Sequence, residues 1–283
     1  MLVAILALIG NAEALGMSQG MAVRVSMLIA SIWWGVFAVV TFLMIKNRDA
    51  GNDRVRKRDL VKIGFKEVFR TLKELYGLKY TCLFLIGYLF YNDGIQTVIL
   101  NSSVFLSQEL FVSRGLEASQ TFLLTIFVIA QVSALFGAVI FERVSRIIGA
   151  KRTILVSLAI WSGIVIYAYG FLDNTTQAMI MAVFIGLVLG SAQALSRSLY
   201  SQMIPKDRVS AFFGLYEISE KGTSWLGNLV FAIVIGVTGS YRQAILALIF
   251  FFVVGSVILL FTNTTKAIHA AGNLTPEEAG NLD

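Results

Sequence analysis

Residues 212–238 read FFGLYEISEKGTSWLGNLVFAIVIGVT, a stretch long enough and apolar enough to cross a lipid bilayer as a helix. Within it, Glu217, Glu220 and Lys221 share one helical face, because residues three and four apart on a helix are neighbours. A charged side chain at the bilayer centre costs about 2.5–3.5 kcal/mol on insertion scales, so these three are expected to point into protein. We predict that Glu217 can pair with Lys221, and that this helix lines a substrate, ion or proton pathway or its gate. A structural salt bridge that locks two helices is the alternative.

The composition supports a membrane protein. The chain is 57% hydrophobic and 14% charged, with a mean hydropathy of +0.77. Seven stretches pass the length test for a spanning helix, which predicts an all-α, polytopic fold. They are Val25–Ile45, Leu83–Leu106, Thr121–Ile140, Thr153–Leu172, Ala178–Leu199, Phe212–Thr238 and Ala244–Phe261.

Positive charge collects in alternate loops. The loops after Ile45, Ile140 and Leu199 are basic, whereas those after Leu106, Leu172 and Thr238 are not. Because Lys and Arg concentrate on the cytoplasmic side, the basic loops and the tail at residues 263–283 are predicted to be cytoplasmic. This distribution also argues against nucleic-acid binding, since eleven of the basic residues fall in one inter-helix loop.

That basic loop, residues 46–80, contains a second helical pattern. From Leu60 to Tyr76, apolar residues recur at helical spacing while Lys62, Lys66, Arg70 and Lys73 fill the other face. An amphipathic helix lying on the inner leaflet is expected, with a regulatory partner helix as the alternative.

Enzymatic chemistry has few candidate residues here. Cys82 is the only cysteine and His269 the only histidine, which excludes an internal disulfide, a Cys-rich metal site and a His-based triad within the membrane. The sequence holds no phosphate-binding loop for ATP. We therefore predict no enzyme, no cofactor and no metal, and transport that is secondary or facilitated.

Polar residues mark two further spans. The run YLFYNDGIQT at residues 88–97 places Asn92, Asp93 and Gln96 at membrane depth. Asp93 is predicted to pair with Lys221, to carry a proton or to bind a cationic group, or else to cap a local break at Gly94.

The span from Ala178 adds Gln193 and Arg197, of which Arg197 is either a snorkelling anchor or a site residue. Gly186 in the same span is expected to allow close helix contact, and Gln131 in the third span to form an interhelical hydrogen bond.

The predicted organisation has four parts. Residues 1–45 are expected to be the remnant of a first half, followed by the basic loop at 46–80, six spanning helices at 81–262 and the tail at 263–283. Among the six, the third and sixth are purely apolar while the others are polar or rich in small residues, as two three-helix repeats would give. Residues 1–10 extend only about 15 Å as a helix, so the chain is expected to be the later part of a longer transporter.

Four motifs resemble those of the major facilitator superfamily, within it the vacuole-effluxer-like branch related to autophagy permeases. They are YNDGIQT at 91–97, GAKR at 149–152, SAQALSRSLYSQMIP at 191–205 and FFGLYEISEKGTSWLG at 212–227. The resemblance covers the chain almost throughout, as part of helix five to helix twelve of twelve. It implies the C-terminal six-helix half of that fold plus one and a half preceding helices, with alternating access against an N-terminal half as the missing partner.

One loop departs from the superfamily pattern G-x-x-x-D-R-x-G-x-K-R. Aligned on Gly149, this chain has Glu142 at the glycine position, Arg146 at the aspartate position and Ile147 at the arginine position. The usual gating salt bridge is therefore not expected, and Glu142 or Glu217 is a candidate substitute. The predicted gating residues are Glu142, Arg143, Arg146, Lys151 and Arg152.

The predicted function is secondary transport of a small solute. Asp93 and Glu220 set against Lys221 and Arg197 suit a zwitterion such as an amino acid, and equally a self-neutralised proton relay. A non-transporting scaffold or receptor and an inactive fragment are the alternatives. The expected membrane is the inner membrane in a bacterium and the vacuolar membrane in a fungus.

Overall fold

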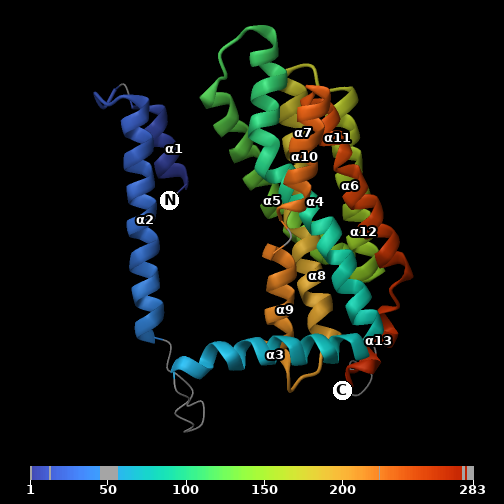
Figure 1. Ribbon diagram of the computed structural model, residues 1–283. Coiled ribbons are helices and arrows are strands. Elements are labelled where there is room, and N and C mark those ends of the chain that lie inside the picture. The colour runs from blue at the N-terminus through green and yellow to red at the C-terminus, as the bar shows by residue number, and fades with distance from the viewer. Residues whose placement is uncertain (1, 13, 45–56, 223, 276–277, 279–283) are drawn as a thin grey trace. The chain divides into compact units, whose positions relative to one another are not determined.

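The computed structural model describes residues 2–12, 14–44, 57–222, 224–275 and 278, and the regular elements among them are all helices (Figure 1). Seven helical segments are long and apolar enough to span a membrane, and they match the seven predicted stretches one to one. The all-α, polytopic fold is therefore confirmed. The segments are Gly20–Met44, Lys79–Arg114, Gln120–Ile148, Ala150–Gly170, Thr175–Gln202, Val209–Thr238 and Tyr241–Phe261.

The chain divides into two compact units, Met1–Leu60 and Val61–Asp283. The first contains α1 (Leu2–Gly10) and α2 (Gln19–Met44), connected through Gly16 at a positive φ of 68°. Large apolar side chains along α2, such as those of Trp34 and Phe42, are exposed. Predictions that fall on residues 45–56 lie outside the described residues.

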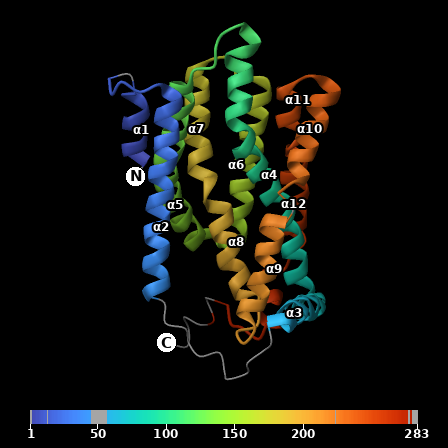
Figure 2. The same cartoon turned by 60° about the vertical axis from the view of Figure 1, so that its left-hand side comes forward.

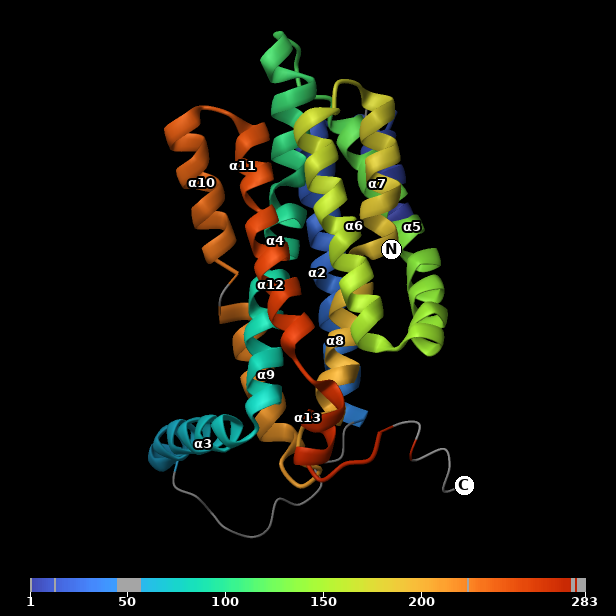
Figure 3. The same ribbon diagram turned by 90° about the vertical axis from the view of Figure 1, so that its right-hand side faces the viewer.

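The second unit holds the remaining helices. They are α3 (Lys57–Gly77), which begins just before the unit boundary, α4 (Lys79–Leu110), the 3₁₀ turn η1 (Val112–Arg114), α5 (Gln120–Ile148), α6 (Ala150–Gly170), α7 (Thr175–Leu189), α8 (Ser191–Gln202), α9 (Val209–Gly222), α10 (Leu226–Thr238), α11 (Tyr241–Ala247), α12 (Ile249–Phe261) and α13 (Thr264–Ala270). α4 is the central helix and packs along α12 (Figure 3). Many of its residues are buried, and it forms one of the six spanning segments in this unit.

α5 and α7 approach each other closely because glycines face each other's backbone. A Cβ atom on Gly186 would overlap the carbonyl oxygen of Ala130, and one on Gly137 would overlap that of Leu187. The expected close contact at Gly186 is therefore confirmed, and Gly137 is its counterpart on α5. Small residues at such contacts let two helix backbones pack with little side chain between them.

Three of the spanning segments are divided. α7 gives way to α8 at Gly190, α9 ends at Gly222 before α10 begins at Leu226, and α11 gives way to α12 at Leu248. The expectation of one continuous helix over 212–238 is therefore wrong. A break of this kind leaves backbone groups at the two helix ends without partners inside either helix.

α3 lies across the spanning helices (Figures 1 and 3). The predicted amphipathic helix at Leu60–Tyr76 is confirmed, with bounds extended to Lys57 and Gly77. Only Leu78 separates it from α4, so the chain turns sharply there. We call this end of the bundle, which also contains the α8–α9 connection and α13, the α3 end. The predicted cytoplasmic side of the chain corresponds to it.

A cluster of ion pairs and hydrogen bonds lies at the opposite end of the bundle. The guanidinium of Arg242 on α11 donates to Glu109 Oε2 at 2.8 Å, to the carbonyl oxygen of Leu172 at 2.5 Å and to Asp173 Oδ1 at 3.2 Å. Arg114 adds a bond of 2.6 Å to the Asp173 carbonyl oxygen. These contacts connect α4, the α6–α7 connection and α11. In the sequence, the same residues were informative only as loop charges.

Candidate functional site

A group of polar side chains bridges α4, α8 and α9. Figures 1 and 2 show α8 and α9 side by side in the half of the bundle next to α3. We call this group the polar cluster, and its members are Tyr88, Asn92, Gln193, Arg197, Glu217 and Glu220. Asn92 lies about 20 Å along α4 from Lys79, which is mid-bilayer depth for a spanning helix.

A chain of hydrogen bonds runs through the polar cluster. Gln193 Nε2 donates to Asn92 Oδ1 at 2.8 Å, and Asn92 Nδ2 donates to the Glu220 carbonyl oxygen at 3.3 Å. The Tyr88 hydroxyl donates to Glu220 Oε2 at 3.2 Å. Residues of three helices are thus joined directly, and a movement of α8 or α9 would alter these bonds.

The ion pair in this region differs from the predicted one. Glu217 pairs with Arg197 of α8, with Nη2 and Oε1 3.1 Å apart, instead of with Lys221. The guanidinium also lies 5.5 Å from the ring centroid of Phe213. Lys221 is exposed and has no ion pair among the described residues. The physical reason is that α8 runs beside α9 and presents a longer, forked cation to Glu217.

The Arg197–Glu217 pair lies on an open face of the bundle. The Arg197 side chain is 57% exposed and that of Glu217 is 39% exposed. Charges at this depth are strongly disfavoured against lipid tails, so this face is suited to water or to further protein. The Arg197–Glu217 pair is thus the exposed part of the polar cluster.

Asp93 is separate from the polar cluster and caps another helix. Its Oδ2 accepts a hydrogen bond of 2.6 Å from the backbone N–H of Gly227, in the first turn of α10. The side chain is fully buried, and Oδ1 has no hydrogen-bond partner among the described residues. A carboxylate is favourable at a helix N-terminus, where backbone N–H groups are unpaired.

Two predictions for Asp93 are therefore wrong. It does not pair with Lys221, and α4 continues as a helix through Gly94. The break that Asp93 caps is the one between α9 and α10. Gly227 allows the close approach, because a Cβ there would overlap Thr97 Oγ1 and lie 3.3 Å from the Asp93 carbonyl oxygen.

Four tyrosines, one of them the cluster member Tyr88, pack together at the polar cluster and were not among the predicted site residues. Tyr88 stacks on Tyr216 with ring centroids 4.5 Å apart, and Tyr200 lies 5.1 Å from Tyr216. Tyr91 contacts Tyr88 edge-on at 5.4 Å and bonds Ser196 at 2.6 Å. Their signal was present in the sequence, since Tyr216 precedes Glu220 by one helical turn and thus shares its face.

The remaining pathway candidate, Gln96, lies one turn beyond Asn92 on α4. It is half-buried and makes no hydrogen bond among the residues that the structure describes. Of the eight predicted pathway residues, the structure joins Asn92, Gln193 and Glu220 directly and places the Arg197–Glu217 pair on the same helices. Asp93 and Gln96 lie nearby on α4, whereas Lys221 is exposed and forms no ion pair among the described residues.

The predicted gating residues make local contacts at the ends of α5 and α6. Glu142 pairs with Arg146 on its own helix, with Oε1 and Nε 2.7 Å apart. Arg143 and Arg152 are exposed. Lys151 Nζ donates to the carbonyl oxygens of Leu260 and Thr262 at 2.9 and 2.8 Å, where it caps the end of α12. The suggestion that Glu142 replaces the gating aspartate is not supported, since its partner is one turn away.

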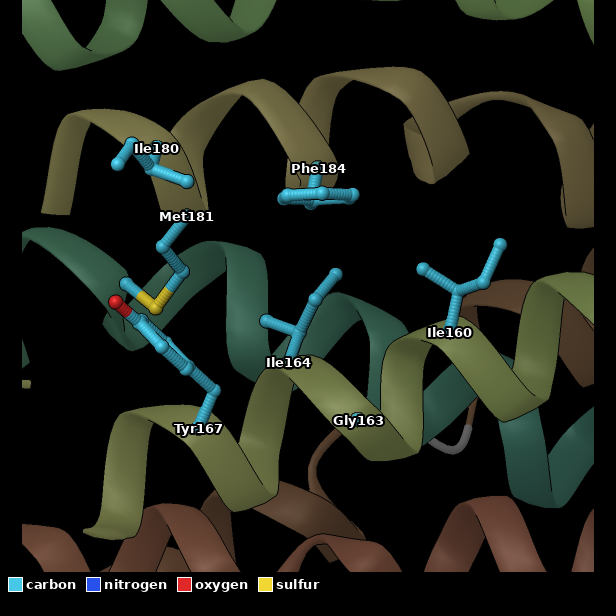
Figure 4. A pocket seen from close by; sticks show the side chains of 7 residues that line it. All are labelled: Ile160, Gly163, Ile164, Tyr167, Ile180, Met181 and Phe184. Carbon is cyan, nitrogen blue, oxygen red and sulfur yellow. The ribbon is translucent and has the colours of Figure 1, made fainter. Parts of the chain in front are cut away.

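Two cavities lie elsewhere. An apolar cavity of about 280 Å³ separates α6 from α7 (Figure 4), lined by Ile160, Gly163, Ile164, Tyr167, Ile180, Met181 and Phe184. A second, of about 270 Å³, lies between α4, α5 and α7 and includes Ser102 and Gln131. Gln131 makes no interhelical hydrogen bond among the described residues, contrary to expectation. Neither of these two cavities is lined by a member of the polar cluster.

The described residues contain no group of three or more His, Cys, Asp or Glu side chains that would hold a metal ion. The polar cluster and Asp93 offer hydrogen-bonding groups, one exposed ion pair and two further carboxyl groups, on α4 and on two divided spans. Such a set can bind a polar solute and exchange protons.

Comparison with known proteins gives a family match. The family described as "Vacuole effluxer Atg22 like" matches residues 1–272. The chain belongs to this family.

Relatives of this Atg22-like chain include a transporter and fungal proteins. The "Uncharacterized MFS-type transporter YxiO" of Bacillus subtilis is 32% identical over 254 residues, covering 90% of this chain and 57% of that protein. "Autophagy-related protein 22" of Kluyveromyces lactis is 27% identical, covering 82% of this chain and 49% of that protein. The protein of the same name from Yarrowia lipolytica is 28% identical, covering 78% and 41%.

The chain spans about half the length of the curated relatives it matches. The resemblance to the major facilitator superfamily and its vacuole-effluxer-like branch is confirmed, and the chain is a multi-pass membrane protein of a transporter family.

Proposed function

We propose that this chain supplies the solute-binding half of a secondary transporter that works by alternating access. The observation that carries the proposal is the polar cluster, which places Arg197, Glu217 and Glu220 together at membrane depth on an open face. A water-filled pathway accommodates these charges, whereas lipid would not. A six-helix half that faces the polar cluster would complete the pathway. The α3 end is proposed to be cytoplasmic.

The proposed substrate is a small zwitterion such as a neutral amino acid. Arg197 is available to a carboxylate and Glu220 to an ammonium group, while Asn92 and Gln193 supply neutral donors and acceptors between them. A proton is the proposed coupling ion, because Glu220 and Asp93 are the carboxyl groups nearest the break between α9 and α10. No covalent step is required, so the protein is proposed to act as a transporter and not as an enzyme.

Reconstitution tests this proposal. The full chain is placed in liposomes together with a complementary six-helix half, and uptake of radiolabelled alanine and leucine is measured with an inward proton gradient. Glu220→Gln is expected to reduce uptake to the level of empty liposomes, and Asn92→Ala to raise KM. Asp207→Asn removes an exposed carboxylate in the α8–α9 connection and serves as the matched control.

The outcomes separate the parts of the proposal. Loss of uptake in Glu220→Gln alone supports a role for the polar cluster. Equal uptake in Glu220→Gln and Asp207→Asn refutes that role. Absence of uptake by the unaltered chain with its complementary half refutes transport of these amino acids.

A further inference from the structure

α3 leaves one face unpartnered at the edge of the bundle. It runs across the spanning helices and turns into α4 within two residues, so it cannot itself be part of a span (Figures 1 and 3). A helix that lies crosswise at the end of a membrane bundle is at the level of the lipid headgroups. What this helix exposes is therefore presented to that layer.

The rotation of α3 about its own axis is fixed by Arg208. This residue, in the α8–α9 connection, bonds Glu67 Oε1 at 2.6 Å, Glu74 Oε1 at 2.9 Å and Thr71 Oγ1 at 3.2 Å. Because these three partners lie four and three residues apart, they share one face of the helix. The Arg208 side chain is 17% exposed, and Thr71 and Leu75 on the same face are buried. This locked face is turned to the bundle.

Aromatic side chains occupy the next face. Phe65, Phe69 and Tyr76 are 65%, 69% and 79% exposed. At about 100° per residue they lie about 120–160° around the helix axis from Thr71. We call them the aromatic stripe. Exposed aromatic residues in a row are typical of a helix whose apolar side enters the headgroup and acyl boundary.

A basic row follows the aromatic stripe around the helix. Lys66, Arg70 and Lys73 are exposed and lie about 200–260° from Thr71 on the same measure. Arg70 also pairs with Glu74, through Nε and Oε1 at 3.1 Å. Clusters of Lys and Arg on an amphipathic helix attract anionic lipids, whose headgroup phosphates then lie beside the apolar side chains.

We propose that α3 binds the anionic phospholipids of the adjacent leaflet, with the aromatic stripe inserted and the basic row on the headgroup phosphates. The locked face fixes which side meets the lipid, because Arg208 holds the opposite side against the bundle. This inference is independent of the proposed transport function, since it concerns a surface remote from the polar cluster.

The test measures the depth of α3 in membranes of two compositions. The full chain carrying Cys82→Ser, to remove its one native thiol, receives a Phe69→Cys substitution and a nitroxide label. It is reconstituted in nanodiscs of phosphatidylcholine alone or of an equal mixture with phosphatidylglycerol. Accessibility of the label to oxygen, which favours lipid, is compared with accessibility to a water-soluble nickel chelate.

The label at position 69 is expected to move toward oxygen accessibility when phosphatidylglycerol is present. The triple variant Lys66→Gln, Arg70→Gln and Lys73→Gln should lose most of this shift. The control is a second triple variant with the same change in charge: Lys79→Gln, Lys206→Gln and Lys266→Gln. It should keep the shift, because these exposed residues lie off the basic row.

Salt provides a second measurement that does not depend on any charge variant. About 1 M NaCl, at which the Debye length is about 3 Å, should reduce the shift in the labelled chain as the triple variant does. Equal water accessibility of the label in both lipid mixtures overturns the proposal. Shielding from both oxygen and the chelate overturns it as well, since it would show that protein covers the aromatic stripe.

Discussion

Gly227→Ala tests the contact between the divided helix and α4. Gly227 lies in the first turn of α10, and its N–H donates to Asp93 Oδ2 at 2.6 Å. A Cβ there would overlap Thr97 Oγ1 and lie 3.1 Å from Thr97 Cβ. The start of α10 must therefore shift away from α4, which lengthens the bond to Asp93.

The magnitude follows from three effects. Overpacking of this kind costs about 1–3 kcal/mol. A weakened hydrogen bond to a buried carboxylate adds about 1.5–3 kcal/mol at most. Alanine in place of glycine returns about 1 kcal/mol through helix propensity. We expect a net destabilisation of about 1.5–5 kcal/mol from these combined effects.

The assay is thermal unfolding of the purified chain in detergent. The fraction that remains folded after heating is measured by size-exclusion chromatography. Gly236→Ala is the matched control, because Gly236 lies on the same helix and a Cβ atom there would meet no atom within 4 Å. Its midpoint should remain unchanged or rise. Thr97→Ala combined with Gly227→Ala should recover part of the loss, because the overlapping hydroxyl is gone.

The reasoning is refuted if Gly227→Ala unfolds at the same temperature as Gly236→Ala. A double variant no more stable than Gly227→Ala alone would show that contact with the Thr97 hydroxyl is not the cause. In a double-mutant cycle, direct contact predicts an interaction energy of about 0.5–3 kcal/mol between the two positions.

Two further stability predictions use the same assay. Gly137→Ala should lower the unfolding midpoint by the equivalent of about 1–3 kcal/mol, because the new Cβ atom meets the Leu187 backbone, which cannot rotate away. The control Gly163→Ala should not lower the midpoint, because a Cβ atom there meets no neighbour within 4 Å. Equal midpoints for the two variants would contradict the prediction. Arg242→Gln should cost about 1–3 kcal/mol, because it leaves Glu109, whose side chain is 16% exposed, without its cation; an unchanged midpoint would show that the cluster does not stabilise the fold.

Much of the fold could be predicted because membrane helices are marked by length and apolarity. All seven spans, and the amphipathic α3, followed from these patterns alone. The interruptions within three of the spans could not be predicted from the sequence. The span that contains the break after Gly222 still passes the hydropathy test for a spanning helix, because a hydropathy window averages over the break.

The candidate site was predicted in part, for a related reason. Helical spacing placed Glu217 and Glu220 on one face, and both contact polar groups of other helices. Polarity within a span selected Asn92 and Gln193, which bond each other. Helical spacing was wrong about the partner of Glu217. Spacing within one helix makes Lys221 the nearest cation in sequence, whereas Arg197 is nearest in space because α8 packs alongside α9.

The Asp93–Gly227 contact shows where such prediction must stop. A buried aspartate is recognisable from one helix, because its desolvation has to be offset by some partner. The partner here is a backbone N–H, 134 residues away, that is free only because another helix is interrupted. Every residue except proline carries that donor, so no side-chain pattern distinguishes Gly227 from its neighbours. Its identity follows only from the approach of α10 to α4, which a side chain would block and which glycine permits.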